Sequence, residues 1–227
     1  MPAEAAGEFR DFCLANFAAM PLLDVTEPGD PLPTRAAADA DLRTDLPRYR
    51  VFQAGAVVAE PTDAVSFWRD DLVGFLMGCS FSTEAKLLAA GIPLRHLDCD
   101  QNEPIFRTSV SCTPSGRFRG PLVVSTRPIP HDQVERARSL SAEYPLAHGA
   151  PVHVGDPAEI GISDLSAPDW GDAIDLLDGD VPVFWACGVT PQGALADAGL
   201  DLVITHAPGH MFITDLRDAD ICGRETL

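Results

Sequence analysis

One thiol and two imidazoles follow apolar runs in the last third of the chain. Cys187 follows the run at residues 183–186, and His206 ends the run that begins at residue 202, with His210 a short loop later. A Thr-Pro pair typical of a helix start separates the two runs. A strand, a short helix and another strand form a unit whose strands are parallel. We therefore expect Cys187, His206 and His210 at one sheet edge, as a thiol beside a catalytic acid and base.

The histidines of the chain allow two other readings. His206 and His210 are also explained as structural residues whose rings bond the carbonyls of the loop between them. His148 and His153 are expected to line the same cleft and bind substrate, and the four rings together are possible ligands of a divalent metal ion. The spacing of residues 206 and 210 contains Pro-Gly, so it is not the helical zinc pair. We expect no cofactor, and a divalent metal ion stays an open alternative.

A second candidate group lies in the string G-C-S-F-S, where one predicted helix ends and another begins. Ser82 is the predicted N-cap of the second helix, with Glu84 in its first turn. A helix N-terminus favours carboxylates and lowers the pKa of a nearby thiol. We expect Cys79 and Glu84 to act in catalysis, and Ser80 and Ser82 to bind a substrate carboxylate. The alternative is a plain turn between two helices.

A carboxylate ligand also calls for a cation, and arginine binds carboxylates with two parallel hydrogen bonds. Arg43, Arg50 and Arg107 are the candidates for this clamp, and Asn102 lies near the last of them. A surface ion pair explains each arginine equally well.

The predicted elements set the fold class. We expect a mixed, largely parallel α/β sheet flanked by helices, with a smaller two-layer α+β subdomain inserted at residues 94–145; the main domain is then residues 1–93 and 146–227. The pattern predicts helices over 8–19, 63–78, 82–91 and 131–142, a hairpin of 49–52 with 56–59, and strands around His96, over 105–110 and over 122–126.

Composition excludes several classes of function. The net charge of −18 argues against a nucleic-acid or anionic-membrane partner. The sequence contains no apolar run of the roughly 18 residues that a membrane span requires, and it does not begin with a secretion signal. We therefore expect a cytoplasmic protein, with a homodimer as the default assembly. Dinucleotide, Walker and nucleophile-elbow motifs do not occur in the sequence.

Four long strings carry a resemblance to a known family: G-C-S-F-S, H-G-A-P-V-H-V-G-D-P, V-P-V-F-W-A-C-G-V-T-P-Q and T-H-A-P-G-H-M-F-I-T-D. The chain resembles the D-glutamate cyclase family, whose bacterial members are described as hydro-lyases. This resemblance implies an α/β fold with a smaller two-layer subdomain. It also implies loss of water from D-glutamate, which closes to 5-oxo-D-proline.

Together, these features predict a lyase that acts on a small amino acid or carboxylic acid, with D-glutamate cyclisation as the leading activity. One alternative is a hydro-lyase for another small carboxylate. The other is a non-catalytic protein that binds a small dicarboxylate or 5-oxoproline.

Overall fold

Three antiparallel sheets make up the strand content of the computed structural model, which describes residues 1–224. The strands are β1 (Leu22–Val25), β2 (Tyr49–Gln53), β3 (Ala56–Ala59), β4 (Phe75–Met77), β5 (Ile105–Ser111), β6 (Pro121–Pro130), β7 (His153–Val154), β8 (Asp180–Ala186) and β9 (Val203–His206). They form a pair β1-β4, a three-stranded sheet β3-β2-β9 and a four-stranded sheet β5-β6-β8-β7.

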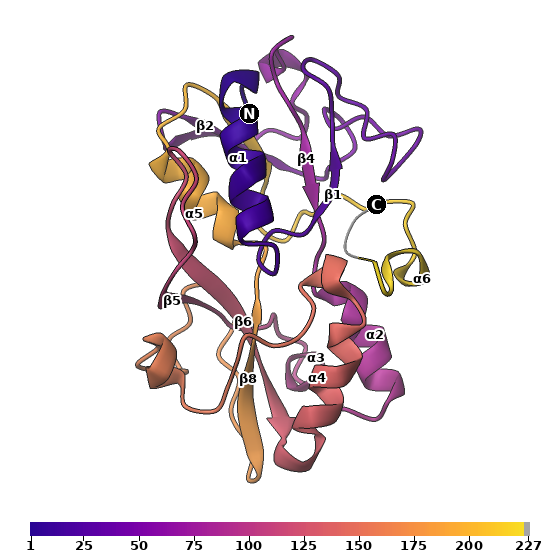
Figure 1. The fold of residues 1–227 in the computed structure, drawn as a ribbon, viewed down its shortest axis with the longest axis vertical. Helices are drawn as coiled ribbons and strands as arrows, with labels where there is room; N and C mark the ends of the chain where they lie inside the picture. The colour runs from indigo at the N-terminus through magenta and orange to yellow at the C-terminus, as the bar shows by residue number, and fades with distance from the viewer. Residues whose placement is uncertain (225–227) are drawn as a thin grey trace.

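Six α-helices accompany these sheets in the described residues (Figure 1). They are α1 (Ala3–Ala15), α2 (Phe81–Ala89), α3 (Arg95–Asp98), α4 (Val134–Ala142), α5 (Thr190–Asp197) and α6 (Asp218–Ile221). Short 3₁₀ turns are η1 (Val65–Phe67), η2 (His131–Gln133), η3 (Pro145–Ala147) and η4 (Pro157–Ile160).

The lower half of the molecule in Figure 1 contains the four-stranded sheet with α2, α3 and α4. Its core joins Leu87 of α2 and Ala137 of α4 to Ile129 of β6 and Trp185 of β8. Strand β6 lies between β5 and β8, and most of its side chains are buried. Alternate residues of β6 therefore point into two covered faces, one of them towards the helices.

The upper half contains α1, α5 and the two smaller sheets (Figure 1). Aromatic rings fill its core: Phe9 of α1 lies 5.0 Å from Phe75 of β4 and 5.1 Å from Phe118, both edge-on. This geometry is a favoured one for aromatic pairs. Helix α1 thus anchors β4, whose last residue comes just before the Gly78–Cys79 segment.

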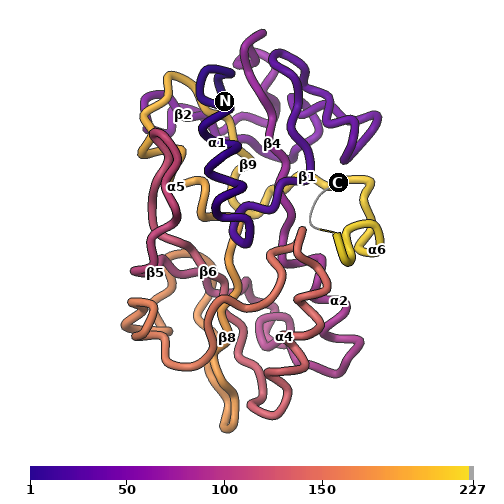
Figure 2. Tube along the Cα trace, in the orientation of Figure 1, coloured from indigo at the N-terminus to yellow at the C-terminus, as the bar shows by residue number. Residues whose placement is uncertain are grey.

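The prediction of a largely parallel sheet is wrong. All the strand pairings named above are antiparallel, and β8 already has β6 and β7 on its two sides. Strand β9 therefore has no free edge of β8 to join, and it pairs with β2, with His206 opposite Tyr49. Figure 2 shows β9 in the upper half of the molecule and β8 in the lower half. Cys187 and His206 consequently do not share a sheet edge.

Two local predictions are also wrong. Residues 63–78 do not form one helix, because the chain makes η1 and then the strand β4, which pairs with β1. His96 lies in the short helix α3 and not in a strand. The predicted hairpin around Gly55 and the helices near residues 82–91 and 131–142 are confirmed.

The expected division at residues 94–145 stays a prediction, although β6 from inside that range pairs along its length with β8 from outside it. In the described part of the chain, no helix is both long and apolar enough to cross a membrane.

Candidate functional site

A buried arginine on β6 is the centre of the candidate site. Arg127 is on the face of β6 that points towards α2 and α3, and its side chain is only 2% exposed. Nη2 donates to Glu84 Oε1 at 2.7 Å, and Nε donates to the same oxygen at 3.2 Å. Arg127 also lies over the ring of Trp185, 5.5 Å from its centre. Such a charge is stable in a protein interior only when it is paired and hydrogen-bonded in this way.

Glu84 is the partner that α2 supplies. His96 Nε2 lies 3.1 Å from Glu84 Oε1, the oxygen that also accepts from Arg127, although the angle is poor for a hydrogen bond. Burial alone would raise the pKa of Glu84, but His96 and Arg127 outweigh it and hold that pKa below its usual value. Glu84 is therefore an ionised carboxylate, and every contact of its side chain described here ends on Oε1.

Two serine hydroxyls complete the contacts of the guanidinium. Arg127 Nη1 donates to Ser125 Oγ at 3.1 Å, and Nη2 donates to Ser80 Oγ at 3.2 Å. Ser125 is two residues from Arg127 on the same face of β6, whereas Ser80 comes just before α2. Each hydroxyl accepts from the cation and so keeps its own hydrogen for another acceptor.

A second carboxyl and two thiols border this group. Glu103 is buried, which raises its pKa, and its carboxylate makes no ion pair with any described residue. Burial also raises the pKa of Cys79, and it raises the pKa of Cys187 to about 12. The charge of Glu103 also raises the pKa of both thiols, and the charge of Arg127 lowers it. Both thiols are therefore protonated near neutral pH, which disfavours a nucleophilic role for either of them.

His148 is a second buried imidazole at the site, besides His96. Its Nδ1 donates to the carbonyl of Ala18 at 2.7 Å, so the ring is held against the turn that follows α1. Burial lowers the pKa of His148 to about 4, with help from Arg127 and against the carbonyls of Ala18 and Gly78. The ring is thus neutral at physiological pH. A Cβ added to Gly188 would lie 3.8 Å from Nε2, which places His148 beside the Cys187–Gly188 segment.

Gly78 allows the segments of the site to come together. A Cβ at this position would overlap the carbonyl oxygen of Leu146, near the start of the turn that leads to His148. The backbones around Gly78 and Leu146 therefore approach more closely than any other residue type permits.

His206 and His210 have the geometry of structural histidines. His206 Nδ1 donates to the carbonyl of Ala207, and His210 Nδ1 donates to that of Pro208, each at 2.8 Å. The loop that carries them still reaches the cluster, because Met211 Sδ lies 3.9 Å from Cys79 Sγ. Their catalytic role stays a prediction.

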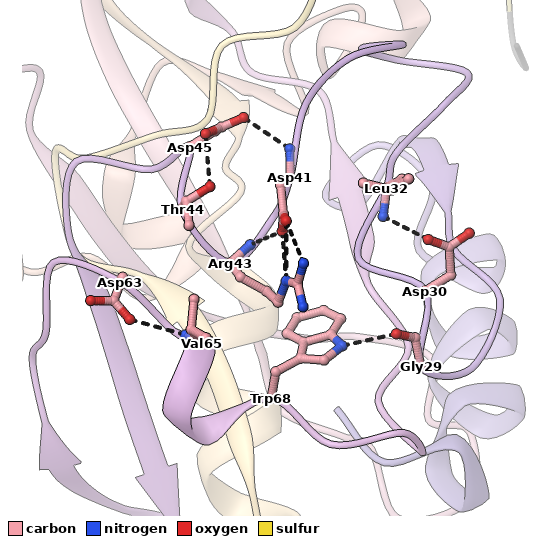
Figure 3. Close-up of polar contacts among 10 residues, drawn as sticks. All are labelled: Gly29, Asp30, Leu32, Asp41, Arg43, Thr44, Asp45, Asp63, Val65 and Trp68. Atoms are coloured by element: carbon pink, nitrogen blue, oxygen red, sulfur yellow. Dashed lines mark hydrogen bonds and ion pairs between the residues drawn. The ribbon is translucent and has the colours of Figure 1, made fainter.

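The three arginines expected to form the carboxylate clamp, and Asn102 near the last of them, are occupied by carboxylates of the protein. Arg43 binds Asp41 through Nε and Nη2 (Figure 3). The others make similar pairs: Arg50 with Glu60, Arg107 with Asp169, and Asn102 with Asp172. The buried Arg127 was not among the predicted residues. A charged residue inside a strand-like stretch, between Val123-Val124 and Ile129 in V-V-S-T-R-P-I-P, was the signal for it.

Neither Ser82 nor His153 makes a described side-chain hydrogen bond to the buried cluster around Arg127. Helix α2 begins at Phe81, so Ser82 is inside it and is not its N-cap. His153 Nε2 donates to the carbonyl of Asp156 at 2.8 Å. Within residues 1–224, no three His, Cys, Asp or Glu side chains converge as metal ligands, so the four histidines do not form one cation site.

An open depression of about 370 Å³ adjoins the cluster. Its walls come from residues 37–47 and 211–215. Met211 lines this depression, and its sulfur lies 3.9 Å from Cys79 Sγ, so the depression and the cluster share this contact. A space of this size accommodates a small metabolite.

Comparison with known proteins identifies the family. A family model described as D-glutamate cyclase matches residues 73–215. A protein of Rubrobacter xylanophilus named "Putative hydro-lyase" is 56% identical over 220 residues, which cover 97% of this chain and 85% of that protein. The chain belongs to the D-glutamate cyclase family.

Other relatives of this member of the D-glutamate cyclase family share a comparable percentage of identical residues with it. A hydro-lyase-named protein of Stutzerimonas stutzeri is 54% identical over 218 residues, covering 96% of this chain and 82% of that protein. YcsI of Bacillus subtilis, with the same descriptive name, is 49% identical over 218 residues, covering 96% and 85%. The range that matches the D-glutamate cyclase family contains the buried cluster from Cys79 to Cys187 and excludes Arg43 and Arg50.

Proposed function

We propose that this protein is a hydro-lyase for a small amino acid, and that it closes D-glutamate to 5-oxo-D-proline and water. The family relationship supports the class of reaction. The observation that carries the proposal is the buried group of Glu84, Arg127 and Ser80, which offers a negative oxygen and a hydroxyl donor next to each other.

The reaction defines what such a site must do. The amine nitrogen forms a bond to the γ-carboxyl carbon, one C–O bond of that carboxyl breaks, and the departing oxygen leaves as water with two protons from the nitrogen. The substrate must therefore be bent until nitrogen and carbon lie within attack range. The site must also move protons and stabilise the negative oxygen that develops on the attacked carbon.

Glu84 and the serines match these needs in the proposed arrangement. Glu84 Oε1 takes the contacts with Arg127 and His96, which leaves Oε2 to accept from the substrate ammonium. Ser80 and Ser125 accept from Arg127, so their hydroxyl hydrogens can donate to a substrate carboxylate or to the developing oxyanion. Substrate enters from the depression lined by Met211.

A matched pair of serine variants tests this function. We expect the purified protein to convert D-glutamate to 5-oxo-D-proline, as measured by chiral chromatography with mass detection. Ser80→Ala should lower kcat about tenfold or more, because it removes one hydroxyl donor but leaves the Arg127–Glu84 pair intact. Ser139→Ala on the exposed face of α4 is the control and should retain wild-type turnover.

Two results would contradict the proposal. Calorimetric binding of 5-oxo-D-proline or of a dicarboxylate without conversion of D-glutamate would favour the non-catalytic binding protein. Conversion of another small acid in place of D-glutamate would keep the protein in the hydro-lyase class but would contradict D-glutamate as its substrate.

A further inference from the structure

We propose that His148 is the catalytic base of this reaction: its Nε2 takes a proton from the substrate amine in a small space that Gly188 keeps open. The inference rests on the proposed function and assigns one of its proton transfers to one atom. It is argued from the tautomer of the ring, the backbone at His148, and the space beside Gly188.

The tautomer follows from the contact with Ala18. A carbonyl oxygen can only accept, so the 2.7 Å contact requires that Nδ1 carries a hydrogen. In a neutral ring, Nε2 then has a lone pair and is the basic atom. The histidine is fixed from behind, which is how a catalytic base is held in one orientation.

The backbone of His148 is in an unusual conformation. Its φ is +73°, whereas a side chain at a positive φ is strained. Among residues 1–224, the other two non-glycine residues with positive φ, Ala54 and Asp100, are exposed, but His148 is buried. Holding a histidine this way costs about 1–2 kcal/mol. Such strain is typical of positions where the orientation of a side chain matters.

Gly188 has no structural reason to be glycine. Its φ is not in the left-handed region, and a Cβ there would meet its nearest atoms at 3.8–4.0 Å, an ordinary contact distance. Gly78 differs, because a Cβ there would overlap the Leu146 carbonyl. The missing side chain at Gly188 therefore leaves a space about the size of a methyl group, and the atom nearest to that space is His148 Nε2.

The surroundings account for a base that gains and then releases its proton. Arg127 and the protein interior disfavour the charged ring, so the proton is readily passed on to the departing oxygen. The carbonyls of Ala18 and Gly78 stabilise the ring while it is charged. The substrate ammonium loses one proton to Nε2 and the N–C bond forms. His148 passes that proton to the departing oxygen, the nitrogen gives up its second proton to the same oxygen, and the C–O bond breaks with release of water.

Three variants test the assignment. His148→Asn suits a positive φ and retains a donor for Ala18, but it has no basic nitrogen, so kcat should fall by about 10²-fold or more with little change in KM. Gly188→Ala fills the space beside Nε2 without a clash and should lower kcat at least about tenfold. Gly193→Ala in α5 adds the same methyl group to open space and should leave kcat within about twofold of wild type.

Separate readouts distinguish failure of the inference from failure of the proposed function. Wild-type turnover by folded His148→Asn or Gly188→Ala, with the far-UV spectrum unchanged, would overturn the role of His148 and leave the function standing. Absence of turnover in the wild type would reject the function. In a wild type that does turn over D-glutamate, the ring-nitrogen NMR signal of His148 is a second readout of the inference: a shift on addition of D-glutamate that is lost in Gly188→Ala supports it, and no shift overturns it.

Discussion

Arg127 is a buried cation, and each of its three guanidinium nitrogens donates to a group of the protein. Glu84, Ser80 and Ser125 take its hydrogens, and Trp185 faces its plane. Removing one partner from a buried pair of this kind costs about 3–5 kcal/mol, because the other charge is left unpaired. Mutations of Glu84 or Arg127 thus test stability and activity together, whereas Ser80→Ala isolates the contribution of a donor.

His148 should make the stability of the protein sensitive to mild acid. The folded state holds the pKa of His148 at about 4, below its ordinary value of 6.5, so the folded state resists protonation. The free energy of unfolding that this group contributes is complete above pH 6.5 and is lost as the pH falls to about 4. We expect a loss on the order of 3 kcal/mol across that window, measured by urea unfolding.

His148→Asn provides the control for this pH dependence, because it cannot take up the proton. Its unfolding free energy should change less than that of the wild type between about pH 6.5 and pH 4. Equal losses in the two proteins would show that other groups cause the acid sensitivity.

At the scale of elements, the approach of β4 to the turn η3 depends on Gly78. Gly78→Ala would press a methyl group onto the buried Leu146 carbonyl, so we expect a loss of about 1–3 kcal/mol in unfolding free energy. Gly7→Ala in α1 meets no atom within 4 Å and should instead stabilise the protein by a few tenths of a kcal/mol or more. Denaturant titration measures both. Wild-type stability of Gly78→Ala would contradict the close approach.

Local patterns predicted the elements whose partners are near in sequence. The hairpin around Gly55 and the amphipathic helices α2 and α4 are of this kind. Residues 63–78 were misassigned because their apolar side chains are spread over separate clusters: Leu72 packs with Val51, and Leu76 packs with Leu23. A short apolar segment of a helix and a short buried strand have similar sequence patterns. Here the pairing of β4 with the distant strand β1 selected the strand.

The candidate site was predicted in part for the same reason. Glu84, Ser80 and Cys79 follow from the start of α2, and Cys187 follows from the end of β8. Their meeting with Arg127 depends on the packing of α2 on β6, a contact between segments far apart in sequence. Sequence spacing alone does not encode such a contact, so two half-buried arginines and an exposed one were chosen in place of the buried one.

At the scale of the whole molecule, the sequence has 34 acidic residues and only 16 basic ones. Repulsion among exposed carboxylates opposes the compact state, and salt screens exposed charges far more than a buried pair such as Glu84–Arg127. We expect the melting temperature at pH 7 to rise by a few degrees as sodium chloride increases from about 0.01 M to about 0.15 M. Potassium chloride should give the same rise. A constant or falling melting temperature would show that surface ion pairs outweigh the repulsion.

Lys86 is the one lysine in the sequence, and in the structure it lies on the exposed side of α2, 3.6 Å from Glu143 beside α4. A reagent that modifies side-chain amines therefore has one target in this protein, and that target lies on the helix that carries Glu84. A fluorophore attached there would report movement of that helix as ligand arrives, without any engineered cysteine.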